Sequence, residues 1–209
     1  MQKKIVYILS EYFAPFQNVG SVKFSKIAKF LSKDNQIVVF TRKNFPQKDI
    51  FLEQDLLVIK ENGGVVFYID EGIKFYKKKN SIDRKITYYL SKIQNKERLY
   101  YLNNQKASRK FVVKGLKIIQ EENLPKPDLI LSTYDDWGSH YLAAKIKKLY
   151  PDTVWIADFR DPIGSHIKTG KYRKLCDEYS LMVSRNADYI TAVSQGTIDS
   201  LKLEEGTNT

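Results

Sequence analysis

Short apolar runs that each end abruptly in polar residues recur along this chain, and stretches with helical periodicity separate them. The two clearest runs are residues 154–162, VWIADFRDP, and residues 186–194, NADYITAVS. A buried parallel strand has this pattern when it delivers polar side chains to the carboxyl edge of a sheet, where open α/β sheets bind their ligands. Because helix-like sequence lies between them, the two runs are predicted to be neighbouring strands that face one cleft.

The alternation of strands and helices predicts an α/β fold with a Rossmann-like, doubly wound and mostly parallel sheet. Residues 1–203 are expected to form this domain, followed by a polar, frayed tail at 204–209. Residues 56–60 and 65–69 are predicted to be either a hairpin or one strand and a loop, with 65–69 the better strand. The other strands are expected at residues 4–9, 36–41, 128–132, 154–157 and 189–193, and the helices at 21–31, from 81, 105–122, 138–150, 171–186 and from 195.

Composition restricts the class of protein further. The chain has 209 residues, of which 43% are hydrophobic, so it can form one large domain with a buried core. A single cysteine, Cys176, excludes an internal disulfide framework and is compatible with a cytoplasmic location. No stretch approaches the roughly 20 apolar residues of a membrane span. The histidines, His140 and His166, lack suitably spaced ligand partners, so no metal site and no cofactor are expected.

The positive charge is concentrated in one segment. The net charge is +11, and residues 74–117 alone hold 14 Lys and Arg residues against two acidic residues. Phe and Tyr residues are interleaved with these bases. This pattern suits an anionic membrane surface and, as a less favoured partner, single-stranded nucleic acid. A solvated helix face whose tyrosines pack inward is the third interpretation.

The first candidate site is the loop that follows the first strand, residues 10–21. It leads into the start of a helix, where free amides and the helix dipole favour anions such as phosphate. Ser21 is predicted to cap this helix, although an ordinary capped connection explains the same residues. The G-x-G-x-x-G and P-loop signatures are absent from the sequence. The predicted ligand-binding residues of this loop are Tyr12, Asn18, Gly20 and Ser21.

The second candidate is the Asp158-Phe-Arg-Asp161 segment at the end of the fifth predicted strand. Two carboxylates flank one guanidinium there, which can bind a sugar hydroxyl, place a general base or orient a phosphate through Arg160. Asp158 and Asp161 are therefore the candidate catalytic residues. The structural alternative is that Arg160 bridges both acids and holds a loop.

The third candidate is the segment from 132 to 140, which combines hydroxyls, aromatic rings and carboxylates. Tyr134 and Asp135 are predicted to bind a carbohydrate, while Asp135 or Asp136 can instead be a helix cap. His140 begins a helix and is expected to be structural. His166, in the loop after Asp161, is predicted to reach the cleft.

Four segments together resemble the N-terminal, acceptor-side domain of GT-B fold glycosyltransferases, in the retaining group called glycosyltransferase family 4. They are ILSEYFAP at residues 8–15, PDLILS at 127–132, ADFRDP at 157–162 and ADYITAVS at 187–194. The last two are the more specific, and the resemblance extends over residues 3–203. It implies one of two Rossmann-like domains, in which this domain binds the acceptor and a C-terminal domain binds a sugar nucleotide.

The resemblance also implies roles for particular residues. The loop at 10–21 would approach the donor phosphate, and Ser194 would lie at the cleft floor. Asp158 occupies the position at which many members carry a histidine, and the glycine doublet of the first loop is reduced to Gly20. The first departure bears on the catalytic assignment, and the second bears on the phosphate-binding role of the loop.

The implied enzyme moves a sugar from a nucleotide donor to a glycan or lipid-linked acceptor in surface polysaccharide synthesis, at the inner face of the plasma membrane. The donor is a substrate, so no cofactor is implied. The donor-binding domain, which carries the family's Glu-x7-Glu motif, is expected to be missing from this chain, so the chain alone is expected to be inactive. The alternative function is a non-enzymatic Rossmann-like module that binds nucleic acid or a separate donor-binding subunit.

Overall fold

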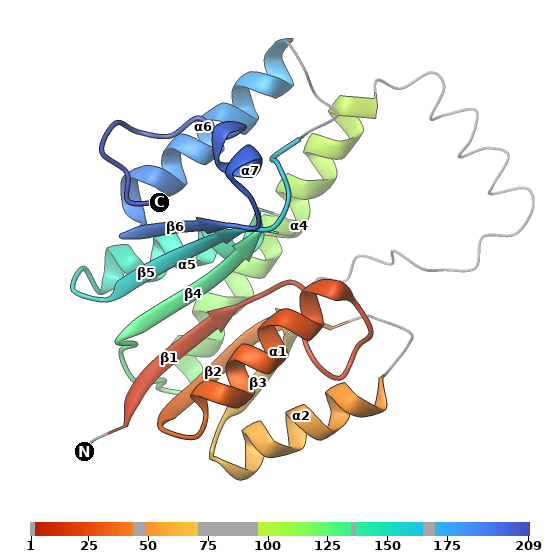
Figure 1. The fold of residues 1–209 in the computed structure, drawn as a ribbon, viewed down its shortest axis with the longest axis vertical. Helices are drawn as coiled ribbons and strands as arrows, with labels where there is room; N and C mark the ends of the chain where they lie inside the picture. Colours follow the sequence, from red (N-terminus) through yellow and green to blue (C-terminus); the bar gives the residue numbers. More distant parts are fainter. Residues whose placement is uncertain (1–2, 44–48, 71–95, 135–136, 165–169) are drawn as a thin grey trace, which may run out of the picture.

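The computed structural model describes residues 3–43, 49–70, 96–134, 137–164 and 170–209. Its centre is a six-stranded sheet in the order β3-β2-β1-β4-β5-β6, in which every neighbouring pair is parallel (Figure 1). This order is that of the Rossmann fold, so the predicted fold class is confirmed. The strands are β1 Lys4–Leu9, β2 Asn35–Arg42, β3 Val65–Ile69, β4 Leu129–Tyr134, β5 Val154–Phe159 and β6 Tyr189–Ala192.

Helices lie on both faces of the sheet (Figure 1). On one face, α1 (Val19–Leu31) and α2 (Ile50–Glu61) pack over β1, β2 and β3. On the other face, three helices of the described residues cover the sheet, and the short α7 (Gln195–Asp199) follows β6. These three are α4 (Lys96–Glu121), α5 (Gly138–Leu149) and α6 (Gly170–Asn186).

Alternating side chains of the central strand enter the two cores. In β1, Val6 and Ile8 pack toward α1 and α2, while Tyr7 and Leu9 pack toward α4 and α5. A strand turns successive side chains to opposite faces, so a strand covered on both faces must be apolar throughout. The uninterrupted run IVYIL at residues 5–9 meets that requirement, which is why it was recognisable in the sequence.

The preferred strand at 65–69 is confirmed as β3, but residues 56–60 form neither a hairpin strand nor a loop, because they belong to α2. Asp49 caps this helix: its carboxylate accepts hydrogen bonds from the amides of Phe51 at 2.9 Å and Leu52 at 3.2 Å. Leu52, Leu56 and Ile59 then face the core at helical spacing. The apolar residues of 52–59 therefore recur with the helical period of 3.6 residues. The five residues 56–60 alone are too short a stretch to show this period. The helix predicted from residue 81 lies mostly outside the described residues.

The C-terminal tail is hydrogen-bonded to the domain, contrary to the expected fraying. Glu204 forms an ion pair with Arg185 at 2.5 Å, and its amide donates to the Ser184 hydroxyl at 3.0 Å. The amide of Ile190 in β6 donates to the carbonyl of Asn208 at 2.9 Å. The tail therefore satisfies a backbone donor at the outer edge of the sheet.

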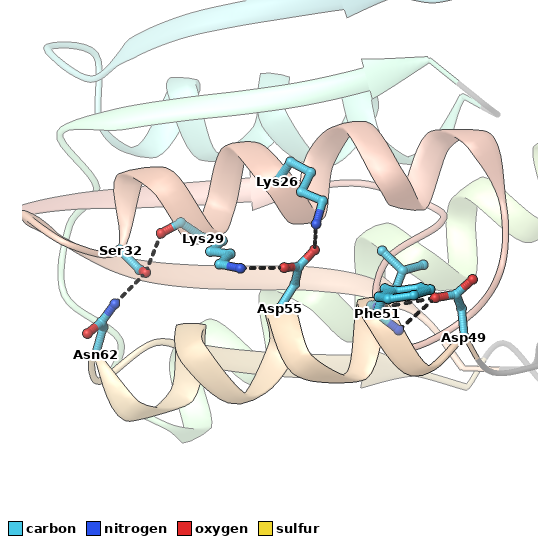
Figure 2. A network of polar contacts seen from close by, with 8 residues as sticks. Lys26, Lys29, Ser32, Asp49, Phe51, Asp55 and Asn62 are labelled. Atoms are coloured by element: carbon cyan, nitrogen blue, oxygen red, sulfur yellow. Dashed lines mark hydrogen bonds and ion pairs between the residues drawn. The ribbon is translucent and has the colours of Figure 1, made fainter.

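Helices α1 and α2 are joined by a buried carboxylate (Figure 2). Asp55 of α2 has a side chain that is 2% exposed and pairs with Lys26 at 2.6 Å and Lys29 at 2.8 Å, both from α1. Burial by itself would raise the pKa of Asp55, but the hydrogen bonds and charges of the two lysines outweigh it and lower this pKa below its ordinary value. Asn62 extends the contact by donating to the Ser32 hydroxyl at 2.9 Å.

Candidate functional site

The candidate site lies at the carboxyl edge of the sheet. The chain runs outward from β1 to β3 and from β4 to β6, so the order reverses between β1 and β4. Ligands of open α/β sheets bind outside the strand ends at such a reversal. The loops that leave β1, β4, β5 and β6 all start at this edge, because the strands are parallel (Figure 1).

Asp158 is the residue that joins the elements of this edge. Its two carboxylate oxygens each accept a hydrogen bond from the Lys23 ammonium group, at 2.8 Å. The Thr191 hydroxyl donates to Oδ1 at 2.9 Å. Lys23 lies in α1, Asp158 in β5 and Thr191 in β6, so one carboxylate connects three elements. The Asp158 side chain is 10% exposed and that of Lys23 is 39% exposed, which leaves the pair within reach of a ligand.

The loop after β1 is held in place from several sides. The Ser10 hydroxyl donates to the carbonyl of Tyr12 at 2.7 Å, and the amide of Ala14 donates to the Ser25 hydroxyl at 3.0 Å. The Tyr68 hydroxyl, from β3, donates to the Ala14 carbonyl at 2.7 Å. Burial raises the pKa of Tyr68 to about 12, so it remains a neutral donor at physiological pH. This loop is therefore a fixed wall of the site.

A second ion pair supports the base of the same loop. Glu11 pairs with Arg42 at the end of β2, and their side chains are 3% and 12% exposed. The Thr41 hydroxyl also donates to the Glu11 carbonyl at 3.2 Å. Since neither charged group faces solvent freely, the pair fixes the exit of the chain from β1.

The start of α1 differs from the prediction in its capping residue. Asn18 caps the helix by accepting from the amide of Gly20 at 2.8 Å, so the predicted Ser21 cap is wrong. Asn18 is extended, with φ −161° and ψ 150°, and the helix begins at Val19, which places Ser21 inside the first turn. Ser21 is 0% exposed, and its hydroxyl has no hydrogen-bond partner among the described residues.

The predicted cluster of Asp158, Arg160 and Asp161 does not form. Arg160 Nε donates to Asp161 at 3.2 Å, whereas Asp158 is paired with Lys23. Asp158 lies within β5 and belongs to the α1 face of the sheet, while Arg160 and Asp161 lie beyond the strand end. The structural alternative, in which Arg160 bridges both acids, does not form either.

The remaining predicted residues have different surroundings. Tyr134 is 4% exposed, and its ring packs against Phe159 and Tyr179 with centroids 5.8 and 6.2 Å apart, which is the environment of a core side chain. Ser194 is exposed, follows β6, and caps α7 by accepting from the amide of Thr197 at 3.2 Å. Tyr12 is half-buried in the first loop. Asp135 and His166 lie outside the described residues.

His140 is structural, as expected. Trp155 Nε1 donates to the Ser132 hydroxyl at 2.7 Å, and the same hydroxyl lies 2.7 Å from His140 Nδ1. The indole group can only donate, so the Ser132 oxygen accepts from Trp155, and its second contact fixes the orientation of the His140 ring. Burial lowers the pKa of His140 to about 3. Ser132 and His140 are both 0% exposed, which excludes contact between this pair and a substrate.

Sequence reasoning missed Lys23 and Thr191. Thr191 had a poor signal, because aligning the Ala-Asp pairs of the two strand segments places Asp188 opposite Asp158, whereas the structure pairs Asp158 with Thr191. Lys23 had none. A lysine in the second turn of an amphipathic helix is ordinary, and only the packing of α1 beside β4 brings it to β5.

Within the described ranges, no group of three or more His, Cys, Asp and Glu side chains is arranged to hold a metal ion. The helices in the same ranges include none with the length and apolarity needed to cross a membrane.

The strand order defines this chain as a Rossmann-like α/β domain, and its polar side chains give it a candidate site at the carboxyl edge of the sheet. No family model matches the sequence, and no curated protein matches it. A solved structure assigned as a UDP-N-acetylglucosamine 2-epimerase from Listeria monocytogenes matches with a TM-score of 0.48 and 14% identity, over 100% of this chain and 44% of that chain. This chain thus spans less than half the length of that protein.

A short-chain dehydrogenase from Oenococcus oeni psu-1 matches with a TM-score of 0.39 and 11% identity, over 93% of this chain and 97% of that chain. Likenesses of this size carry no argument about the reaction or the substrate. The functional conclusion therefore depends on the residues of the site.

Proposed function

We propose that this chain is the acceptor-binding half of a retaining glycosyltransferase that moves a sugar from a nucleotide donor to a glycan or lipid-linked acceptor. The observation that carries the proposal is the Asp158 carboxylate, held by Lys23 and Thr191 at the carboxyl edge of the sheet. The motif that contains Asp158 is also one of the two most specific segments in the resemblance to this class of enzyme.

The hydrogen bonds of Asp158 suit the binding of a hydroxyl group. A carboxylate has about four lone-pair sites. Lys23 uses two of them and Thr191 uses one, so about one site is left to accept a proton from a sugar hydroxyl. In the proposed enzyme, Asp158 binds and orients the attacking hydroxyl of the acceptor.

The donor phosphate is assigned to the start of α1. Gly20 and Ser21 lie in its first turn, where the helix dipole favours negative charge. Lys23 is one turn further along, and its ammonium group adds a positive charge between this turn and Asp158. Asp161 stays a candidate catalytic residue, and Arg160 and Ser194 stay predicted ligands, at the same edge. The nucleotide itself is assigned to a donor-binding domain or a separate subunit that closes over this edge, and the chain alone is predicted to be inactive.

The test is a transfer assay on the chain together with its donor-binding half, with radiolabelled nucleotide sugars and a membrane lipid extract as acceptor. Asp158→Asn is expected to lower kcat by about 100-fold or more, because an amide cannot bind Lys23 and a hydroxyl in the same way. Asp152→Asn is the matched control: Asp152 is an acid paired with a lysine, but it precedes β5 and lies at the opposite edge. Wild-type transfer by Asp158→Asn would remove the proposal.

The proposed location is the inner face of the plasma membrane, and the basic side of α4 supports it. Arg109, Lys114 and Lys117 are exposed there, and Val113 beside them is 65% exposed. Each basic side chain near an anionic bilayer contributes about 1 kcal/mol of attraction. The rest of the basic segment at 74–117 lies largely outside the described residues.

Sedimentation with phosphatidylglycerol vesicles tests this location. Binding is expected at low salt and weakens with salt. The double variant Lys114→Gln/Lys117→Gln should bind several-fold more weakly than Lys33→Gln/Lys60→Gln, in which two exposed lysines of the α1 and α2 layer are changed. Stronger, salt-dependent binding of single-stranded DNA or RNA than of vesicles would instead favour the nucleic-acid alternative.

A further inference from the structure

A hollow lies between α4 and α5, away from the carboxyl-edge site. It has a volume of about 270 Å³ and is lined by Ser108, Arg109, Val112 and Val113 of α4 and by Tyr141 and Lys145 of α5. We call it the α4–α5 groove. The two helices approach closely beside it, since a Cβ atom on Gly115 would lie 2.6 Å from a methyl group of Leu142.

The groove contains a polar group that the fold does not satisfy. Ser108 is 2% exposed, and its hydroxyl has no hydrogen-bond partner within the described part of the chain. A buried polar group without a partner costs about 1–3 kcal/mol. A serine within a helix can donate to the carbonyl one turn earlier, and this one does not. Its hydroxyl is therefore available to a ligand in the groove.

The charge and the apolar surface of the groove indicate which ligand fits. Arg109 and Lys145 supply one positive charge from each helix, and none of the groove-lining residues named above is acidic. Val112, Val113 and the ring of Tyr141 supply an apolar wall. Val113, which lines the groove, is 65% exposed, so a large part of this apolar side chain is open to a ligand.

We propose that the α4–α5 groove binds one anionic amphiphile. Its carboxylate or phosphate head would lie between Arg109 and Lys145 and pair with the Ser108 hydroxyl, while the first carbons of its chain cover Val112, Val113 and Tyr141. Pockets for small molecules usually measure about 300–1,000 Å³, so the groove takes the head and the start of a chain and leaves the rest on the surface. This proposal does not depend on sugar transfer and can be tested on the chain alone.

The experiment is calorimetric titration of the 209-residue chain with monododecyl phosphate below its micelle concentration. Saturable one-to-one binding is expected. Inorganic phosphate lacks the chain and dodecyl maltoside lacks the charge, so each should bind at least about ten-fold more weakly. Laurate in place of the phosphate distinguishes a carboxylate ligand from a phosphate ligand. Vesicles of phosphatidylglycerol, with and without competing monododecyl phosphate, distinguish a headgroup in a bilayer from a free amphiphile.

Variants separate a site from general adsorption. Ser108→Ala and Lys145→Gln are expected to weaken binding of monododecyl phosphate by about five-fold or more, whereas Lys148→Gln, on an exposed position of the same helix α5, should not. Ser108→Ala should fold with unchanged or slightly higher stability, because the hydroxyl has no partner and alanine is the better helix former. Absence of saturable binding, equal binding of dodecyl maltoside, or unchanged affinity in both variants would each overturn the proposal.

Discussion

His140 is a buried residue whose protonation state can be predicted from its contacts. Its Nδ1 pairs with the Ser132 hydroxyl at 2.7 Å, and burial lowers its pKa from 6.5 to about 3. In the unfolded chain the imidazole takes up a proton near pH 6.5, and in the folded chain it does so only near pH 3. The unfolded state therefore binds more protons between these values, so His140 contributes stability that is complete above about pH 6.5 and is lost as the pH falls.

The variant His140→Asn tests this contribution. The Asn side chain can replace Nδ1 as the partner of the Ser132 hydroxyl but does not titrate. Between pH 6.5 and 4, the free energy of unfolding of the wild-type protein should fall by on the order of a few kcal/mol more than that of the variant, in urea titrations at each pH. Parallel pH profiles for the two proteins would show that His140 is not the group responsible.

Asp158 shows how far a single residue could be assigned from the sequence. Its position at the end of a strand was visible, because apolar residues precede it and a charged pair follows. Its partner was not visible. The sequence offered Arg160, two positions away, but Arg160 lies beyond the end of β5 and pairs with Asp161, and Lys23 takes the carboxylate instead. Neighbours in sequence are thus poor guides to partners at a strand end.

Among the elements, the α1–α2 pair depends on the buried contact of Asp55 with Lys26 and Lys29 (Figure 2). Asp55→Asn is expected to lower the free energy of unfolding by about 1–3 kcal/mol at pH 7. The cost stays moderate because the two lysine side chains are 55% and 38% exposed and can return to water. Urea unfolding measures this difference.

The control for this prediction is Lys117→Gln, which removes an exposed pair with Glu121 on α4 and should change stability by less than about 0.5 kcal/mol. The lowered pKa of Asp55 sets the pH dependence. Its contribution is complete above the ordinary value of 3.8 and is lost as the pH falls below it. An effect of Asp55→Asn no larger than that of Lys117→Gln would mean that apolar packing alone holds α1 to α2.

At the scale of the whole molecule, β6 is the least protected part of the sheet. It is a four-residue edge strand, and Tyr189 and the adjacent Val193 are 51% and 58% exposed. Deletion of residues 204–209 removes the carbonyl that accepts from the amide of Ile190. Hydrogen exchange at Ile190 should then become about ten-fold faster or more, while exchange at Ile8 in the central strand β1 stays unchanged.

Mass-spectrometric exchange on the full and shortened chains can measure both sites. Equal acceleration at Ile190 and Ile8 would mean that the tail stabilises the whole domain and not the edge. No acceleration at either site would show that the tail is already detached from β6 in the full-length chain in solution.

The sequence by itself determined the class of fold. Parallel strands covered on both faces must be apolar over their whole length, and amphipathic helices must separate them, so the alternation was readable in the one-dimensional pattern. The six strands and the end of β5 at which Asp158 lies followed from it. The sequence also indicated that a polar residue caps the start of α1, although the capping residue is Asn18 and not Ser21.

Only the tertiary structure decided which side chains meet. Lys23 and Asp158 are 135 positions apart and touch because β4 and β5 add to the sheet on the side of β1 opposite β2. Tertiary structure likewise brings Glu11 to Arg42. It also forms the α4–α5 groove, whose walls are the helices that precede and follow β4 in the chain. Periodicity reports which face a residue occupies, but contacts between distant elements depend on strand order and helix packing, and no local pattern encodes them.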